Sequence, residues 1–216
     1  MTYRVKECFH TLQGEGVHTG RAAVFLRFSG CNLWSGRERQ RGTAACDFCD
    51  TDFVGTDGDG GGRFESASEL AAHVEGRWTV DQETQGRRYV VCTGGEPLLQ
   101  LDESLIDELH VRGFEVAVET NGTQPAPGGL DWVCVSPKGN SDVVLTEGDE
   151  LKLVYPQLLA PPERFEEMAF EHFLLQPMDT GDAARNADYT KKAVEYCRRN
   201  PRWRLSLQTH KILDIP

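Results

Sequence analysis

Short, nearly continuous apolar runs recur along the chain, and each one ends in a polar or glycine-containing group. Runs of this kind are typical of strands buried on both faces, as in parallel sheets. The runs cover residues 22–28, 89–92, 115–118, 132–135, 151–155, 172–175 and 204–207. The pattern therefore predicts a sheet of about six or seven mostly parallel strands.

Segments with helical spacing separate several of these runs. A capping-box pattern from Ser66 to Glu69 begins the first predicted helix. The second covers residues 102–112, with Gly113 as a C-cap, and the third covers 188–199. Their apolar faces carry Leu70, Val74 and Trp78; Leu105, Ile106 and Leu109; and Val194 and Cys197. Later connections are short, which predicts an α/β fold in the form of an incomplete, TIM-like barrel with few helices.

Composition narrows the class of protein. A length of 216 residues fits one domain, 1–216, and the glycine-rich segment 55–62 is interpreted as a flexible surface loop inside it. The net charge of −11 argues against a general nucleic-acid binder. Neither a membrane-spanning apolar run nor a signal peptide is visible. Seven cysteines without a secretion signal favour reduced thiols and a cytoplasmic location.

Polar groups follow five of the predicted strands, as TGGE, ETNG, SPK, QPMD and QTH. In parallel α/β folds the working groups gather at the carboxyl ends of the strands. Glycine, proline and asparagine also simply terminate strands, so any one of these groups has a structural interpretation. Five such ends together favour a functional site at this edge of the sheet.

Cys31, Cys46 and Cys49 form a C-x14-C-x2-C pattern directly after the first predicted strand. Three interpretations are open on spacing alone. They are a zinc site, a redox pair formed by Cys46 and Cys49, and a [4Fe–4S] cluster with one iron left free of protein ligands. The remaining cysteines, which lie in apolar contexts, are interpreted as buried small residues. They are Cys8, Cys92, Cys134 and Cys197.

Neighbouring motifs favour the cluster. Phe48 precedes the third cysteine, and Gly94–Pro97 reads GGEP. This combination resembles the radical S-adenosylmethionine (SAM) superfamily, although the first cysteine spacing is fourteen residues in place of the usual three. The closer resemblance is to the 7-carboxy-7-deazaguanine synthase family, in which an expanded cluster loop is known. The segments that carry it are FHTLQGEG (9–16), FLRFSGCNLW (25–34), CDFCDTDF (46–53), CTGGEPLLQ (92–100), ETNG (119–122), SPK (136–138), QPMD (176–179) and QTHK (208–211).

This resemblance implies a radical SAM core fold and a carbon–nitrogen lyase activity in queuosine and 7-deazapurine biosynthesis. The family contracts the ring of 6-carboxy-5,6,7,8-tetrahydropterin to 7-carboxy-7-deazaguanine, with loss of ammonia. The implied cofactors are a [4Fe–4S] cluster, SAM and Mg2+. The implied partners are a one-electron donor such as flavodoxin or ferredoxin and a second copy of the chain, with no nucleic acid and no membrane.

The resemblance also implies roles for particular residues. The cluster-binding loop is 29–53, with Cys31, Cys46 and Cys49 as its ligands, and Thr51 is the implied Mg2+ ligand. SAM is bound by Phe48, Cys49, Asp50, Gly94, Gly95, Glu96, Glu119, Ser136, Pro137, Lys138, Gln176, Pro177, Met178 and Asp179. The N- and C-terminal segments cap the substrate, which is bound by Leu12, Gln13, Gly14, Glu15, Arg27, Thr93, His210 and Pro216. In this reading Glu119 lies near the ribose of SAM, and Pro216 contributes its α-carboxylate.

Two other functions stay open at this stage. One is a different radical SAM enzyme, such as a glycyl-radical-activating enzyme, although those usually keep the short cysteine spacing. The other is a zinc-stabilised binding module without catalysis. Arg37, Arg39 and Arg41 in the expanded loop are either a solvated loop surface or a docking site for an acidic electron donor.

Overall fold

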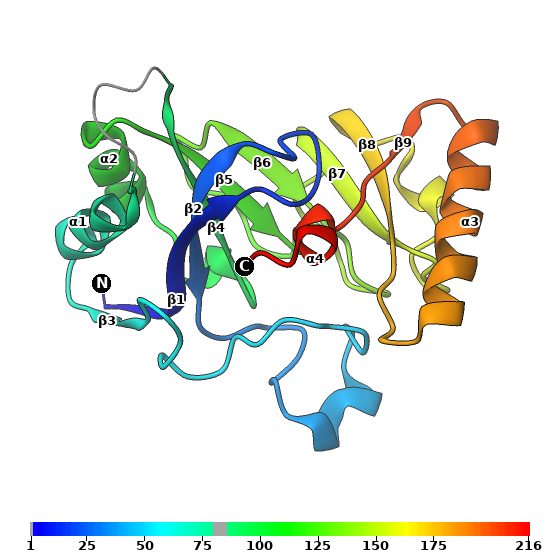
Figure 1. Cartoon of the computed structure of the whole chain (residues 1–216), viewed down its shortest axis with the longest axis horizontal. Coiled ribbons are helices and arrows are strands. Elements are labelled where there is room, and N and C mark those ends of the chain that lie inside the picture. Colours follow the sequence, from blue (N-terminus) through cyan, green and yellow to red (C-terminus); the bar gives the residue numbers. More distant parts are fainter. Residues whose placement is uncertain (1, 80–85) are drawn as a thin grey trace.

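The computed structural model describes residues 2–79 and 86–216, and one nine-stranded sheet runs through this part of the chain (Figure 1). The order across the sheet is β3-β1-β2-β4-β5-β6-β7-β8-β9. The strands are β1 (Tyr3–Leu12), β2 (Ala22–Phe28), β3 (Gly62–Phe64), β4 (Arg88–Gly94), β5 (Phe114–Thr120), β6 (Trp132–Val135), β7 (Glu147–Tyr155), β8 (Ala169–Pro177) and β9 (Trp203–Leu205). Neighbours from β2 to β9 are parallel, whereas β1 pairs antiparallel with β2 and β3.

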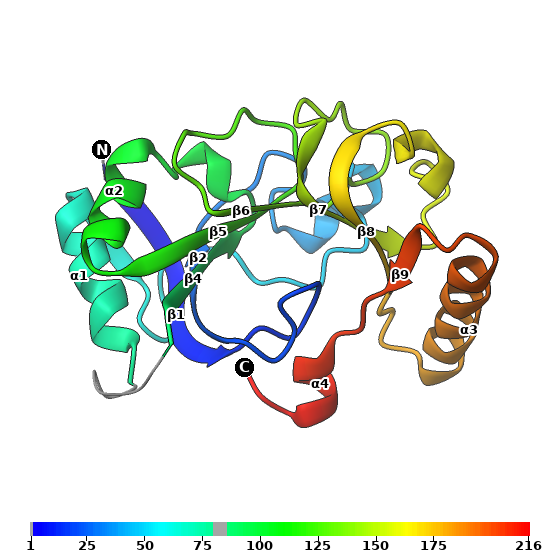
Figure 2. The same cartoon turned by 90° about the horizontal axis from the view of Figure 1, so that it is seen from above.

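The sheet is curved but not closed, because its two edge strands, β3 and β9, do not pair with each other. Figure 2 shows it as an arc, with α4 (Thr209–Leu213) lying on the open side. The seven parallel strands correspond to the seven apolar runs, so the predicted incomplete barrel is confirmed. The same criterion misses β1, because Lys6 and Glu7 interrupt its apolar pattern and the strand is irregular between Val5 and Glu7.

Few helices cover the sheet. α1 (Ala67–Arg77) and α2 (Glu103–Val111) lie together at one end, and α3 (Ala183–Arg199) lies at the other, against β8 and β9 (Figure 1). The β5–β6 and β6–β7 connections carry no helix. The remaining turns of 3-10 helix are η1 (Glu38–Thr43), η2 (Pro97–Leu99) and η3 (Pro162–Phe165). Among the described residues, no helix is long and apolar enough to cross a membrane.

Local hydrogen bonds explain where two helices begin. The hydroxyl of Ser66 accepts from the amide of Glu69 at 3.2 Å, and the Glu69 carboxylate accepts from the amide of Glu65 at 2.8 Å. The carboxylate of Asp102 accepts from the amide of Leu105 at 3.0 Å. These caps satisfy amides that have no partner inside the helix, which confirms both predicted starts.

The third helix is longer than predicted, and of its two predicted apolar residues Cys197 packs against the core whereas Val194 does not. It begins at Ala183, where Asp182 accepts from the amide of Arg185 at 2.8 Å. Its buried residue is Ala193, while Val194 is 38 % exposed. The prediction of 188–199 was wrong at its start because the first turns carry exposed alanines and polar residues, which give no buried apolar periodicity.

Two apolar clusters cover the outer face of the sheet. The first joins α1 and α2 to the strands from β1 to β5, and it includes Leu70, Leu105 and Val116. The second lies under η3, β8 and β9 and includes Phe165 and Trp203. A third, smaller cluster of Ala23, Tyr89, Val91 and Ala117 lies on the inner face, so the polar side chains of that face are confined to the carboxyl ends of the strands.

The segment 55–62 is not the free surface loop that its glycines suggest. The amide of Gly58 donates to the oxygen of Lys6 at 2.9 Å, and the amide of Cys8 donates to the oxygen of Asp59 at 2.8 Å. A methyl group on Gly61 would lie 2.2 Å from the oxygen of Lys6. Glycine is therefore required by the close approach of this segment to β1, and the segment leads directly into β3.

Candidate active site

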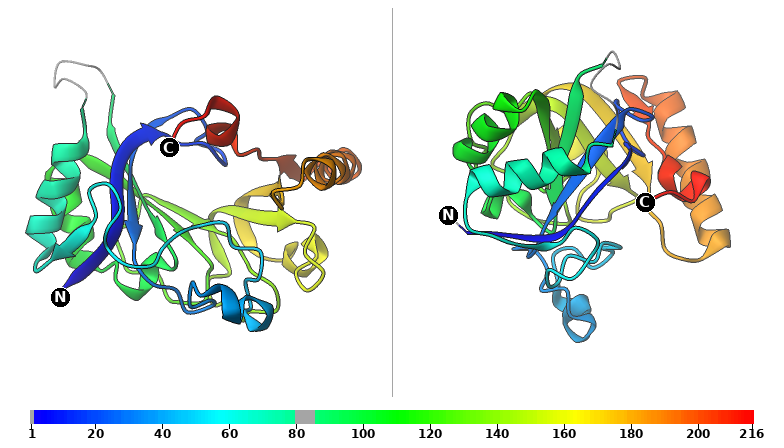
Figure 3. Two further views of the ribbon diagram at one scale, coloured as in Figure 1. Left: turned by 60° about the horizontal axis from the view of Figure 1, so that its bottom comes forward. Right: turned by 60° about the vertical axis from the view of Figure 1, so that its left-hand side comes forward.

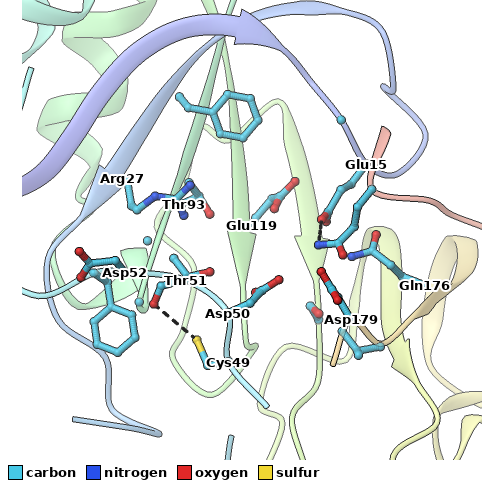
Figure 4. Close-up of a pocket in the computed structure, with 18 of the residues that line it drawn as sticks. Glu15, Arg27, Cys49, Asp50, Thr51, Asp52, Thr93, Glu119, Gln176 and Asp179 are labelled. Carbon is cyan, nitrogen blue, oxygen red and sulfur yellow. Dashed lines mark hydrogen bonds between the residues drawn. The ribbon is translucent and has the colours of Figure 1, made fainter. Parts of the chain in front are cut away.

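One cavity of about 450 Å3 opens at the carboxyl ends of the parallel strands. Every residue predicted for the site lines it except Glu96 and Pro137. Figure 4 shows that these side chains come from separate parts of the chain, with Arg27 and Thr93 on one side, Glu119 in the centre and Glu15 on the other side. The topology thus assembles in one place the strand ends that the sequence marks as polar.

The three cysteines of the expanded motif line this cavity together. Cys49 accepts a hydrogen bond from Cys46, which lowers the pKa of Cys49 to about 6 and raises that of Cys46 far above its usual value. The amide of Leu33 donates to the sulfur of Cys31 at 3.4 Å. Within the described part of the chain, no group of three or more His, Cys, Asp or Glu side chains is already arranged to hold a metal ion.

The other cysteines lie outside the cavity, as predicted from their apolar contexts. Cys8, Cys92 and Cys134 are buried in the sheet, and Cys197 is half-buried on α3. Burial raises the pKa of the Cys8 thiol to about 12. This separation leaves Cys31, Cys46 and Cys49 as the thiols that a bound cofactor could reach from the cavity.

The glycine pair after β4 packs directly on the start of the cluster loop. A methyl group on Gly94 would lie 2.4 Å from the oxygen of Phe28, and one on Gly95 would lie 2.2 Å from the oxygen of Gly30. Gly95 also lies against the Cβ of Cys31. Glycine is needed here for the contact between two backbones, so this turn fixes the first cysteine relative to the sheet.

Glu96, which the resemblance assigns to SAM, does not line the cavity. It is fully buried, and its carboxylate accepts from the hydroxyl of Thr120 at 2.6 Å and the amides of Asn121 at 2.8 Å and Leu98 at 3.0 Å. Burial raises the pKa of Glu96 although these donors oppose the shift. The side chain therefore links the end of β4 to the end of β5 from beneath the cavity wall.

Arg27 points into the cavity from β2, and its orientation is set by the neighbouring strand. Its Nε donates to Oε1 of Glu7 at 2.7 Å, and the two residues are register partners in the β1–β2 ladder. Thr93 is the register partner of Arg27 on β4. A guanidinium held through Nε keeps its two terminal nitrogens for a carboxylate ligand.

A charged floor lies across the cavity from the cysteines. Lys152 donates to Oε2 of Glu15 at 2.7 Å and to Oε1 of Glu119 at 3.2 Å. Oε1 of Glu119 also accepts from the amide of Gln13 at 2.9 Å, and Oε1 of Glu15 accepts from that of Gln208 at 2.9 Å. Glu119 therefore contacts Gln13, which the resemblance assigns to the substrate.

Lys152 and Gln208 were missed as site residues at the sequence level. Lys152 is a single charge inside the apolar run 151–155, which is the same signal that marks Arg27 inside the run 22–28. A lone charge inside a buried apolar run therefore marks Lys152 as a candidate site residue, just as it marks Arg27. Gln208 belongs to the QTHK motif, but of that motif only His210 was assigned to the site, because the sequence does not show where the C-terminal segment crosses the cavity.

The C-terminal segment closes one side of the site. The amide of Thr209 donates to the oxygen of Gly14 at 2.8 Å, and the hydroxyl of Thr11 donates to the oxygen of Pro216 at 3.0 Å. Figure 3 shows α4 beside the loop that follows β1. His210, Pro216 and Leu12 all line the cavity, so the predicted substrate-side residues from both ends of the chain do meet.

Lys211, on α4, bridges two loops at the cavity mouth. Its Nζ lies 2.7 Å from Asp50 of the cluster loop and 2.6 Å from Asp179 after β8. The ion pair with Lys211, together with donors from Gly181 and Asn186, holds the pKa of Asp179 well below its usual range. These three side chains form the acidic bridge, a name used below for Lys211, Asp50 and Asp179.

The remaining predicted residues lie along the rim between these groups. Lys138 donates to the oxygen of Ser136 at 2.9 Å and to its hydroxyl, while Pro137 faces away and its oxygen accepts from Gln157 at 3.2 Å. The amide oxygen of Gln176 accepts from the hydroxyl of Ser206 at 3.1 Å. The rim residues that reach the cavity are Phe48, Thr51, Ser136, Lys138, Gln176, Pro177 and Met178.

Comparisons with known proteins agree with this geometry, although no family model matches the chain. It is 64 % identical to the 7-carboxy-7-deazaguanine synthase of Bradyrhizobium diazoefficiens and 62 % identical to that of Bordetella pertussis, over all of both chains in each case. It is also similar to the crystal structure of QueE from Escherichia coli, with a TM-score of 0.68 and 29 % identity over 96 % of this chain and 94 % of that one. The chain therefore belongs to the 7-carboxy-7-deazaguanine synthase family.

Proposed function

We propose that this protein converts 6-carboxy-5,6,7,8-tetrahydropterin to 7-carboxy-7-deazaguanine in a Mg2+-dependent radical SAM reaction that releases ammonia. It would then be a carbon–nitrogen lyase of queuosine and 7-deazapurine biosynthesis. The observation that carries the proposal is the shared cavity, with three cysteines on one wall and Arg27, Thr93 and the charged floor on the opposite side. The relatedness to named synthases supports the same reaction.

The donor set fits a [4Fe–4S] cluster. Cys31, Cys46 and Cys49 offer three soft sulfur ligands, and the amide of Leu33 already donates to one of them, as is common around iron–sulfur clusters. Three protein ligands leave one iron for SAM. When bound, the cluster and SAM would supply the 5′-deoxyadenosyl radical that removes hydrogen from C6 of the substrate.

The protein's own contribution is to place SAM and substrate against each other. On the cluster side, the backbone of Gly94 and Gly95 and the rim segments 136–138 and 176–179 would hold SAM, with Phe48 and Asp50 beside it. Glu96 would act by fixing the ends of β4 and β5, since its carboxylate already has three protein donors. The rim would thus orient SAM, which the cluster alone would hold only at its methionine end.

On the opposite side, Arg27 would bind the substrate carboxylate with its two terminal nitrogens, beside the hydroxyl of Thr93. The segment from Leu12 to Glu15 would read the edge of the pterin ring, covered by His210 and Pro216. Thr51 lines the cavity next to Asp50 and Asp52, an oxygen-rich set that suits Mg2+, which keeps most of its waters. Mg2+ would then orient the substrate carboxylate relative to Arg27.

The proposal extends to a one-electron donor, such as flavodoxin or ferredoxin, to a homodimer and to the cytoplasm. The structure separates the three arginines of the expanded loop. Arg37 and Arg39 are exposed, whereas Arg41 donates to the oxygens of Asp47 and Cys49 and lies over the ring of Trp34. Arg37 and Arg39 are therefore the charges available for an acidic donor, and Arg41 supports the cluster loop.

The test is anaerobic reconstitution followed by incubation with reductant, SAM, Mg2+ and 6-carboxytetrahydropterin. We expect about four iron and four sulfide per chain, and formation of both 5′-deoxyadenosine and 7-carboxy-7-deazaguanine by mass spectrometry. Serine at position 31, 46 or 49 should abolish both products, while Cys197→Ser, on the outer helix, should keep them. If deoxyadenosine forms without 7-carboxy-7-deazaguanine, the radical SAM chemistry stands and the proposed substrate is wrong. If the protein binds zinc and no sulfide, both the radical SAM chemistry and the substrate are refuted.

A further inference from the structure

We propose that Lys152 is a positioning residue of this site: its buried ammonium holds Glu15 and Glu119 together so that Glu119 presents a free carboxylate oxygen to N–H donors of the substrate ring. This inference rests on the function proposed above and deepens it. It assigns to the floor of the cavity a residue that touches neither the cysteines nor the rim.

Lys152 is placed where a charge is costly unless it is paired. The residue is 3 % exposed and lies near the carboxyl end of β7, inside the sheet. Its Nζ lies 2.7 Å from Oε2 of Glu15, in the loop after β1, and 3.2 Å from Oε1 of Glu119, on β5. An isolated ammonium in such a place would lose its proton, whereas paired carboxylates keep it charged.

The titratable groups around Lys152 come from four parts of the chain, and among them the buried thiol of Cys134 stays uncharged because burial raises its pKa. Glu15 lies in the loop after β1, Glu119 on β5, Cys134 on β6 and Glu150 on β7 itself. Burial alone would lower the pKa of Lys152, but Glu119 and Glu15 raise it well above its usual value. Burial raises the pKa of Glu150, whereas Lys152 outweighs burial at Glu15 and holds its pKa well below normal. One ammonium therefore keeps the carboxylate of Glu15 ionised and also pairs with that of Glu119.

The arrangement leaves one acceptor facing the ligand space. Oε1 of Glu119 accepts hydrogen bonds from both Lys152 and Gln13. Among the described residues, no protein group donates a hydrogen bond to its Oε2. Glu119 lines the cavity and its side chain is 22 % exposed. A planar heterocycle with an exocyclic amino group and ring N–H groups offers the donors that such an oxygen accepts.

Removal of the ammonium should change how Glu15 titrates. In Lys152→Met, the carboxylate of Glu15 has no counter-charge, so burial is no longer opposed by the ammonium and the pKa of Glu15 rises in the folded protein. A raised folded-state pKa makes the folded protein bind protons, so its stability falls as pH rises. We expect the melting temperature of Lys152→Met to increase on acidification from pH 8 to pH 6, while that of the wild type stays nearly flat.

The kinetic readout concerns binding more than turnover. We expect Lys152→Met to raise KM for the pterin at least tenfold at pH 7, with a smaller change in kcat, because the acceptor is lost before chemistry begins. The double variant Lys152→Met/Glu15→Gln restores the net charge of the floor; because Glu15→Gln alone already removes a contact assigned to the substrate, KM of the double variant is compared with KM of Glu15→Gln and should lie within about threefold of it. A residue that only fills space would make the double variant no better than the single one.

Lys6→Met is the matched control for the melting profile. Lys6 is also a buried lysine with two carboxylate partners, Asp52 and Asp57, but their side chains are 71 % and 81 % exposed. Water can solvate these carboxylates when the lysine is removed, so the melting temperature should show no rise toward pH 6.

Each result bears on one of the two proposals. Wild-type protein that loads its cluster but does not turn over the pterin would refute the proposed function, and the melting profile would still decide whether Lys152 holds Glu15 ionised. A flat profile for Lys152→Met, or an unchanged KM in an active enzyme, would overturn the inference. If Lys152→Met does not fold, the melting profile and KM of the double variant Lys152→Met/Glu15→Gln are compared with those of Glu15→Gln instead.

Discussion

Gly14 lies against the imidazole of His210 so closely that a methyl group on Gly14 would be 2.2 Å from Nδ1 of the ring. The oxygen of Gly14 also accepts from the amide and the hydroxyl of Thr209, at 2.8 and 2.9 Å. The loop after β1 and the start of α4 are thus joined by both a steric fit and two hydrogen bonds. This joint determines where the C-terminal segment crosses the cavity.

We predict that Gly14→Ala displaces α4 and raises KM for the pterin at least tenfold, because the new methyl group and the His210 ring cannot occupy the same space. Overpacking of this kind costs about 1–3 kcal/mol of stability. Amide exchange of residues 208–213 should become faster in the variant. Gly76→Ala, in open space on α1, is the control, and it should gain about 0.5–1 kcal/mol without a change in KM.

A second prediction concerns the contact between the glycine turn and the cluster loop. Gly95→Ala would place a methyl group 2.2 Å from the oxygen of Gly30 and 2.7 Å from the Cβ of Cys31. Separation of the two backbones should move Cys31, so reconstituted protein should hold less than half of the wild-type iron and sulfide. Gly42→Ala lies in the same loop with no neighbour within 4 Å and should load normally. Full loading of Gly95→Ala would contradict the structural role given to this turn.

Arg27→Lys tests whether the forked guanidinium matters at the substrate side. Lysine keeps the charge but loses the bond from Nε to Glu7 and the two-nitrogen contact with a carboxylate, a loss of about 1.5–3 kcal/mol in transition-state binding. We expect kcat/KM to fall about tenfold to hundredfold, mainly through KM. Arg21→Lys, which breaks a comparable pair with Glu115 outside the cavity, should leave KM within about twofold. Equal effects of the two variants would argue against a substrate contact for Arg27.

The acidic bridge gives a prediction about pH. Asp179 has a lower pKa in the folded protein than in the unfolded chain, so its contribution is complete above the unfolded value of about 4 and is lost as pH falls through the folded value. Amide exchange of residues 209–213, corrected for its intrinsic pH dependence, should therefore be constant from pH 8 to pH 5. In Lys211→Met it should be several times faster throughout that range. Lys192→Met, which removes an exposed pair with Asp188 on α3, should change nothing at α4.

Much of the fold could be predicted from the sequence, because buried parallel strands leave apolar runs that need no partner to be recognised. The strands that were missed, β1 and β3, are those whose pattern depends on tertiary contacts. Lys6 is polar yet buried against the segment 52–57, with its Nζ 3.0 Å from the oxygen of Val54. The glycines of 55–62 suggest a free loop, but Gly58, Gly60 and Gly61 are the residues that let the segment approach the backbone of β1.

For the site, the motifs named almost all of the residues that line the cavity, since the strand ends of a parallel sheet must meet. What the sequence does not contain is which atoms face one another. Glu96 belongs to a motif but uses its carboxylate inside the protein, and Glu119 lies with Gln13 and Lys152. These distinctions depend on side-chain direction, which no spacing along the chain specifies.

The two apolar clusters on the outer face have one more consequence, for the way the molecule opens. Val133 packs against both clusters, but the cluster under α3 and β9 has its own buried residues, such as Phe165 and Trp203. Regions with separate cores open as separate cooperative units. Because Gln208 and Lys211 follow β9 in the chain, a fluctuation confined to that half would withdraw one wall of the cavity while the cysteine loop stayed folded on the other half.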